Sequence, residues 1–171
     1  ITLGNDAGDT VNFGTLDITG GAVTLTESSG SSIDNLSASS ITLNSTGHIT
    51  DTTNATISVT GTADLSVTDN TLYDIILGEG VSDSLALGNV RVDARDVDLT
   101  EQSSGTNFTG TNTVTRDLDV NATGAITDST GTQLSIAGAT VLNAGISAIT
   151  LGGDVGDLTH FNTLDVTGGA I

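Results

Sequence analysis

The sequence predicts an all-β fold, in which the chain winds into a parallel β-helix (β-solenoid) of about seven coils with three strands in each coil. Three observations predict it. A long segment recurs at a fixed spacing, apolar residues recur at a shorter spacing within it, and the composition lacks the bulky side chains of a globular core. Self-similarity at a fixed period is the sequence signature of repeat architectures, whose units bury their apolar faces against one another.

The long repeat is visible by direct comparison of the two ends of the chain. Residues 1–23 and 149–171 are identical at 15 of 23 positions without a gap, and a diverged copy begins at Ile75. The 74-residue repeats therefore start at positions 1, 75 and 149, which are evenly spaced. We predict that residues 1–171 form a single β-helix segment. Because the chain begins and ends inside a repeat, we expect a fragment of a longer solenoid.

A shorter period divides each repeat into coils of about 25 residues, three to a repeat. An apolar residue opens a strand once in each coil, and a second apolar residue follows two positions later. This spacing of two is typical of a strand with one buried face. A third apolar position follows seven or eight positions after each start, beyond a break rich in Gly, Asn and Ser that turns a corner. The predicted starts are Leu16, Ile41, Leu65, Val90, Leu118, Leu142 and Leu164.

The composition fits a thin core built from strands. The chain has no Pro, Cys, Met or Trp, and only three Phe and one Tyr, so its apolar residues are almost all Ile, Leu, Val and Ala. Small branched side chains suit strands that stack at about 4.8 Å, which gives seven coils a length of about 33 Å. A β-sandwich has no reason to keep apolar columns in step. A calcium-binding β-roll requires GGxGxDxUx units, whereas Gly20-Gly21 is followed by Ala22.

Two segments, Thr15–Glu27 (TLDITGGAVTLTE) and Ala122–Gly145 (ATGAITDSTGTQLSIAGATVLNAG), resemble the shafts of filamentous-haemagglutinin-type exoproteins of bacteria. Those proteins are very large secreted adhesins. The resemblance covers essentially the whole chain and implies a right-handed β-helix, export to the bacterial cell surface or the extracellular space, and a structural or adhesive role. The secretion domain and the receptor-binding tip of that family have no counterpart in this sequence.

The charge limits the partners. Three Arg and no Lys against 21 acidic residues give a net charge of −18, which disfavours nucleic acid and anionic membrane surfaces. No apolar run approaches the roughly 20 residues of a membrane-spanning helix, so membrane insertion is not predicted. The partners that we expect are the neighbouring coils of the same chain, further copies that join end to end or side by side through bare strand edges, and host or biofilm glycans.

Catalytic chemistry is not predicted. Polysaccharide lyases with a β-helix fold need a basic residue beside an anionic sugar, and only Arg91, Arg95 and Arg116 are available. We expect Arg91 to point outward and to pair with Asp119 one coil above it. His48 and His160 have no second His or Cys nearby in sequence, so neither predicts a metal site.

Carboxylates give the one tentative metal site, for calcium. Asp9, Asp83 and Asp157 are equivalent in the three repeats, and the coil spacing places Asp34 in the same position as Asp9 one coil later. Carboxylates stacked about 5 Å apart either take up protons or recruit a cation. The alternative is that these residues form solvated turns. No other cofactor is predicted, and the complete tentative set is Asp6, Asp9, Asp34, Asp83, Asp154 and Asp157.

Three functions remain as hypotheses. The first is a shaft or stalk of a large bacterial extracellular adhesin or fibrous surface protein. The second is a segment of a self-assembling extracellular filament or sheath. The third is a β-helix that binds or degrades polysaccharides.

Overall fold

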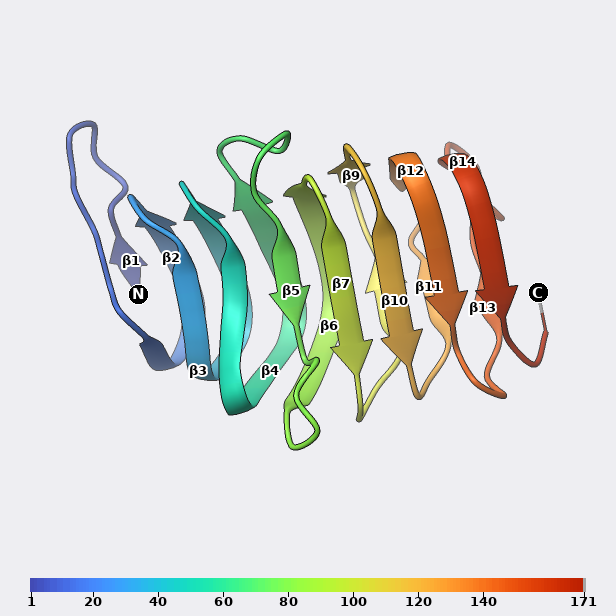
Figure 1. Ribbon diagram of the computed structural model, residues 1–171, viewed down its shortest axis with the longest axis horizontal. Helices are drawn as coiled ribbons and strands as arrows, with labels where there is room; N and C mark the ends of the chain where they lie inside the picture. Colours follow the sequence, from blue (N-terminus) through green and yellow to red (C-terminus); the bar gives the residue numbers. More distant parts are fainter. Residues whose placement is uncertain (171) are drawn as a thin grey trace.

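The computed structural model describes residues 1–170, and within them 14 strands form one continuous sheet that winds into a parallel solenoid without helices (Figure 1). The all-β solenoid predicted from the sequence is confirmed. The strands are β1 (Thr2–Leu3), β2 (Leu16–Glu27), β3 (Ser31–Ser45), β4 (Ile49–Val67), β5 (Ile75–Leu77), β6 (Ser84–Ala94), β7 (Val97–Glu101), β8 (Thr106–Phe108), β9 (Thr111–Val114), β10 (Leu118–Ala122), β11 (Ile126–Asp128), β12 (Gln133–Asn143), β13 (Ile149–Thr150) and β14 (Leu158–Thr167).

The solenoid has three faces, which we call A, B and C in chain order. Face A contains β5, β7 and β10, face B contains β8, β11 and β13, and face C contains β9. Longer strands pass around corners: β4 contributes to all three faces, whereas β12 and β14 each contribute to faces C and A. Each strand pairs in parallel with its counterpart in the next coil.

The core is a column of branched aliphatic side chains inside the three faces. Leu25, Leu43, Leu65 and Val92 occupy successive rungs of face C and are at most 2% exposed. Burial of one such side chain contributes about 1.5–3 kcal/mol before entropic costs. Among the predicted inward positions, Leu72 and Leu164 are exposed, Ile18 and Val166 are half-buried, and Ile171 lies outside the described residues; the others are buried.

The stacking register differs from the predicted one. Ile41 pairs with Ala63 rather than with Leu65, and Leu65 pairs instead with Leu43 and Val92. The coil is also shorter than predicted. The equivalent corner residues Asp74, Asp96 and Asp117 follow one another at separations of 22 and 21 in sequence, and the chain makes about 8 turns. The predicted strand starts belong to different faces of the solenoid. The alternation of inward and outward residues has a period of two on every face, so the sequence pattern does not show to which face a strand belongs.

The 74-residue repeat is therefore three coils and one further face, not three coils as predicted. Ile1 leads into β1, whose residues pair with Thr24 and Leu25 on face C. Ile75 lies on face A, where it pairs with Ile49 and Val97. Ile149 lies on face B, where it pairs with Ile126. Successive repeats thus place the same sequence on different faces of the solenoid.

Because the chain has no Cys, a disulfide can test this register. Asn121 and Asn143 are paired outward residues, and the Asn143 amide donates to Asn121 Oδ1 at 3.3 Å. We expect the double variant N121C/N143C to form an intramolecular disulfide on mild oxidation, since paired positions of parallel strands lie within the Cα separation of about 4.4–6.8 Å that a disulfide spans. Mass spectrometry of the oxidised protein checks this. The matched variant N121C/G145C follows the predicted register instead, and its preferential cross-linking would contradict the structure.

Candidate functional site

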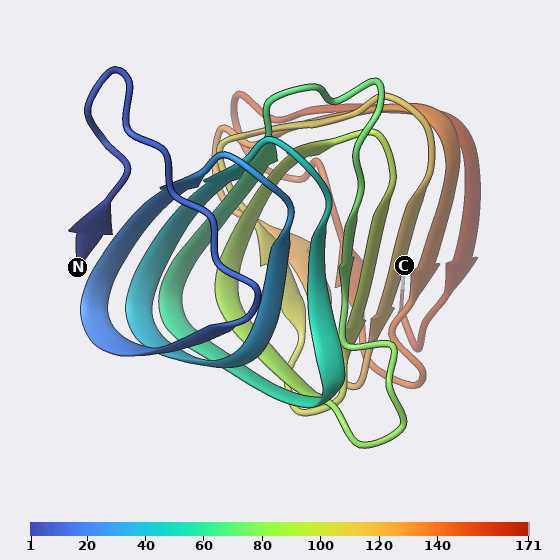
Figure 2. The same cartoon turned by 60° about the vertical axis from the view of Figure 1, so that its left-hand side comes forward.

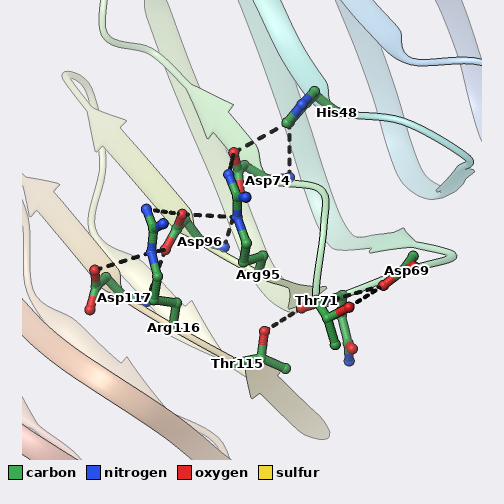
Figure 3. Close-up of polar contacts among 10 residues, drawn as sticks. His48, Asp69, Thr71, Asp74, Arg95, Asp96, Thr115, Arg116 and Asp117 are labelled. Carbon is green, nitrogen blue, oxygen red and sulfur yellow. Dashed lines mark hydrogen bonds and ion pairs between the residues drawn. The ribbon is translucent and has the colours of Figure 1, made fainter.

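A row of charged residues follows the corner between faces C and A (Figure 3). Asp74, Asp96 and Asp117 each precede the first inward residue of face A, one coil apart. Each carboxylate accepts a hydrogen bond from the backbone N–H at the same position of the next coil: Asp96 N at 3.3 Å, Asp117 N at 3.0 Å and Ala139 N at 2.7 Å, respectively. The carboxylates therefore tie successive coils together at a corner where strand pairing is interrupted.

Two arginines neutralise this row. Arg95 binds Asp74 in a bidentate manner, with Nε–Oδ1 at 2.8 Å and Nη2–Oδ2 at 2.7 Å, and Arg116 Nε donates to Asp96 Oδ1 at 2.7 Å. Burial opposes ionisation of Asp74, but the hydrogen bonds and charge of Arg95 outweigh it and lower the pKa of Asp74 below its ordinary value. At the start of the row, His48 Nδ1 accepts from Asp74 N at 3.1 Å.

An acidic depression of about 300 Å³ lies beside the charged row on face A. Ile76, Asp98 and Asp119 are outward residues on consecutive rungs at its base. Burial raises the pKa of Asp98 to about 7. A hydrogen bond to Glu79, repulsion from Glu79 and repulsion from Asp119 contribute to the same rise. Burial and the charge of Glu79 also raise the pKa of Asp119. Burial thus disfavours the charged form of both carboxylates, and the nearby carboxylate of Glu79, from the loop after β5, adds to the effect.

Two glutamates are buried inside corners, which sequence reasoning missed. Glu27 and Glu101 are at most 1% exposed. Glu27 accepts from Phe13 N at 2.8 Å, and Glu101 accepts from Leu87 N at 3.0 Å. Phe13 and Leu87 are separated by one repeat length of 74 residues, and so are Glu27 and Glu101. The signal was available in the sequence as the shared Leu-Thr-Glu of residues 25–27 and 99–101.

Three of the tentative calcium residues close identical turns. Asp9, Asp83 and Asp157 each accept, through Oδ2, a hydrogen bond from the backbone N–H three positions earlier, at 3.2, 2.6 and 2.6 Å. The second oxygen of Asp83 accepts from Ala55 N at 3.0 Å, and that of Asp157 accepts from Gly131 N at 2.7 Å. Both oxygens of Asp83 and of Asp157 therefore accept backbone donors, and Asp83 is buried rather than solvated.

The structure does not bring the tentative calcium residues together. The three turns lie at different corners because each repeat advances the chain by one face. The turn that holds Asp6 and Asp9 is therefore distant from the turn that holds Asp83, and both are distant from the turn that holds Asp154 and Asp157. Asp34 lies at the corner between faces A and B and accepts from Thr52 Oγ1 at 2.7 Å, so its predicted place above Asp9 is wrong. Among residues 1–170, no three His, Cys, Asp or Glu are arranged to hold a metal ion.

The arginine prediction also needs correction. Arg91 points outward as expected, but its Nη1 contacts Asp64 Oδ1 at 2.5 Å, because face C places Asp64 on the neighbouring rung. Asp119 pairs with Asp98 on face A. All three arginines thus make ion pairs within the chain. His160 is exposed on β14, next to Ser135 of β12.

Comparison with known proteins identifies a repeat family. A family model described as repeats of unknown function (DUF5649) matches residues 20–84 and 94–165. No curated protein and no solved structure matches the chain. Within residues 1–170, no helix has the length and apolarity needed to cross a membrane.

The corner glutamates provide a test of stability. We expect Glu101→Ala to lower the free energy of unfolding by about 2–4 kcal/mol, since it leaves Leu87 N, Ser104 Oγ and Thr106 Oγ1 without their acceptor inside the solenoid. Denaturant unfolding measures this loss. Glu27→Ala should cost a similar amount because it has the same role, whereas Asp17→Ala on the exposed surface is the control. An equal, small effect of all three would contradict the assignment.

The acidic depression predicts a pH-dependent stability difference. The raised pKa of Asp98 means that its ionisation disfavours the folded state, so its contribution is most favourable below the unfolded pKa of about 3.9 and is lost as pH rises through about 7. We expect Asp98→Asn to raise Tm by about 2–4 °C at pH 8 and to have little effect at pH 4, since screening limits a half-exposed site.

Thermal unfolding of Asp98→Asn between pH 4 and pH 8 measures this difference. Asp165→Asn is the matched control, because its rung neighbour is Val141 rather than a carboxylate. A Tm gain for Asp98→Asn that is the same at every pH would refute the expectation.

Proposed function

This chain belongs to the family of repeats of unknown function (DUF5649), and on that premise we propose that it is a shaft segment of a large bacterial extracellular adhesin or fibrous surface protein. The shaft acts mechanically, by holding other parts of the protein away from the cell. The segment itself has no catalytic role in this proposal. The sequence resemblance to filamentous-haemagglutinin-type shafts points to the same function.

The observation that carries the proposal is the uninterrupted parallel ladder. Face A alone links Ile49, Ile75, Val97, Leu118 and Thr140 through consecutive pairings. A rod that bends or stretches must break main-chain hydrogen bonds in several faces at once. At about 4.8 Å per coil, about 8 turns extend roughly 38 Å, and each further coil would lengthen the rod by the same step without changing its cross-section.

The surface also suits an extracellular rod. The net charge of −18 favours solubility and opposes side-by-side aggregation of identical rods. The charged row at the corner of faces C and A adds contacts between coils where strand hydrogen bonds are absent. Few segments outside the strands are long enough to offer a protease an extended, accessible backbone.

A second candidate is a segment of a self-assembling filament, in which coils of another molecule stack on those of this chain. Ile1 and Leu3 are 54% and 41% exposed in the first coil, and Leu158 and Leu164 are 64% and 51% exposed in the last. A hollow of about 510 Å³ between β13 and β14 is lined by Leu142, Leu151 and Phe161, among others. Coils that stack here, whether from the same chain or from another molecule, would cover these residues and pair the free strand edges.

Electron microscopy of the intact gene product distinguishes the two candidates. We expect thin, unbranched rods of fixed length, which an antibody against residues 75–148 labels on the surface of intact producing cells. Indefinite fibres that grow with protein concentration would favour the filament instead. Compact particles, or labelling only after the cells are opened, would reject both. Release of reducing or unsaturated ends from acidic glycans would contradict the absence of a catalytic role.

A further inference from the structure

The corner between faces C and A is longer after β4 than in the neighbouring coils. It takes up residues 46–48 after β3, 95–96 after β6 and 115–117 after β9, whereas residues 68–74 follow β4. The additional residues form a segment, drawn in green, that rises beyond the ends of β4 and β5 (Figures 1 and 2). We call residues 68–73 the strap, because they contact coils on both sides of their own.

Short-range hydrogen bonds fix the shape of the strap. Asp69 Oδ1 accepts from the backbone N–H of Thr71 at 3.0 Å and from its hydroxyl at 2.6 Å. The carbonyl of Asp69 accepts from the backbone N–H groups of Leu72 and Tyr73, both at 3.1 Å. An aspartate that closes its own turn in this way restricts the backbone beside it, so Asn70 lies in a defined turn.

Asn70 connects the strap to the two coils that follow it. Its Nδ2 donates to Asp93 Oδ1 at 2.6 Å in the next coil. The hydroxyl of Thr115, one coil further on, donates to the carbonyl of Asn70, and Figure 3 shows this hydroxyl directed toward the strap. Because β4 pairs with β6 and β6 pairs in turn with β9, the bond from Thr115 to Asn70 bypasses the intervening coil.

The base of the strap contacts the coil before it. The ring of Tyr73 meets the ring of His48 edge to face, with the ring centroids 5.4 Å apart. The carbonyl of Tyr73 accepts from the backbone N–H of Arg95 in the following coil at 2.8 Å. The strap therefore makes contacts that extend from residue 48 to residue 115.

A bond across two coils changes how a solenoid can open. In most solenoids each unit contacts only its neighbours, so unfolding can begin at one end and advance unit by unit. Here the coil that carries Thr115 cannot separate unless its bond to the strap also breaks. The charged row joins the same coils at the same corner, because Arg95 binds Asp74 and Arg116 binds Asp96.

We propose that the strap is a brace that makes the three coils of residues 49–117 open as one cooperative unit instead of one coil at a time. The strap and the charged row supply this coupling in addition to the strand pairing that every coil has. In a shaft, such a unit resists progressive unwinding from a loaded end. That consequence rests on the proposed function, whereas the coupling itself does not.

Hydrogen exchange of individual amides, measured by NMR on the intact chain, tests the coupling. Phe108→Leu weakens the third coil of the unit on face B, far from the strap, because Phe108 is fully buried. We expect it to speed exchange in β4 and in β9 by the same factor. In the Thr115→Val background, which removes the hydroxyl from a side chain of similar shape, Phe108→Leu should speed exchange in β9 about fivefold more than in β4.

Thr123→Val is the matched control, because the Thr123 hydroxyl donates to Ser104 O at 3.4 Å in the adjacent coil. In that background Phe108→Leu should still act equally on β4 and β9. The proposal is overturned if Phe108→Leu alone leaves β4 unchanged, if Thr115→Val does not separate the two strands, or if Thr123→Val separates them as well.

A purely local role of the strap is thereby distinguished from coupling, since a local contact would alter exchange near Thr115 without changing how a distant perturbation spreads. Circular dichroism and Tm of each variant check that the solenoid is intact, and Leu99→Val is a milder perturbation of the same coil. Electron microscopy could reject the shaft while the exchange result stands, so failure of one does not imply failure of the other.

Discussion

The parallel stacking of one coil directly on the next is the constraint on which the rest of this structure depends. Main-chain hydrogen bonds fix the axial distance between equivalent residues at about 4.8 Å, whatever the side chains are. Inward positions must then form columns, as Leu25, Leu43 and Leu65 do, and outward positions must form rows. The free energy of the core therefore depends on the correct alternation in every strand rather than on a few large side chains.

The same constraint forces like charges together on a strongly acidic surface. Where arginines are present, as at Arg95 and Arg116, they neutralise a row of aspartates, and the remaining carboxylate oxygens accept backbone N–H groups that no strand partner satisfies. Where no arginine pairs with the carboxylate, as at Asp98 and Asp119, burial and the charge of Glu79 raise the pKa. Charge is thus tolerated through hydrogen bonds at corners and through proton uptake on the face.

The repeat length is not a whole number of coils, so equivalent residues of successive repeats make the same local contacts on different faces of the solenoid. Glu27 and Glu101 make the same corner contact, and Asp9, Asp83 and Asp157 close the same turn, although each repeat occupies different faces. These motifs need only their own sequence and the adjacent coil, which is alike on every face. A repeat of three whole coils would align its loops along one edge, whereas this one distributes them around the rod.

The all-β solenoid, most of the inward alternation and the repeat starts at 1, 75 and 149 could be predicted from the sequence alone, because each depends on residues close together in the chain. Only the tertiary structure decided which residues become neighbours across coils. The pairing across coils depends on the summed lengths of the three corners in each coil. The sequence does not reveal this sum, because the period of two is the same on all faces. Arg91 therefore contacts Asp64 rather than Asp119, and Asp34 does not lie above Asp9. The burial of Glu27 and Glu101 also depends on tertiary structure. A carboxylate enters the interior only where a corner supplies backbone and hydroxyl donors.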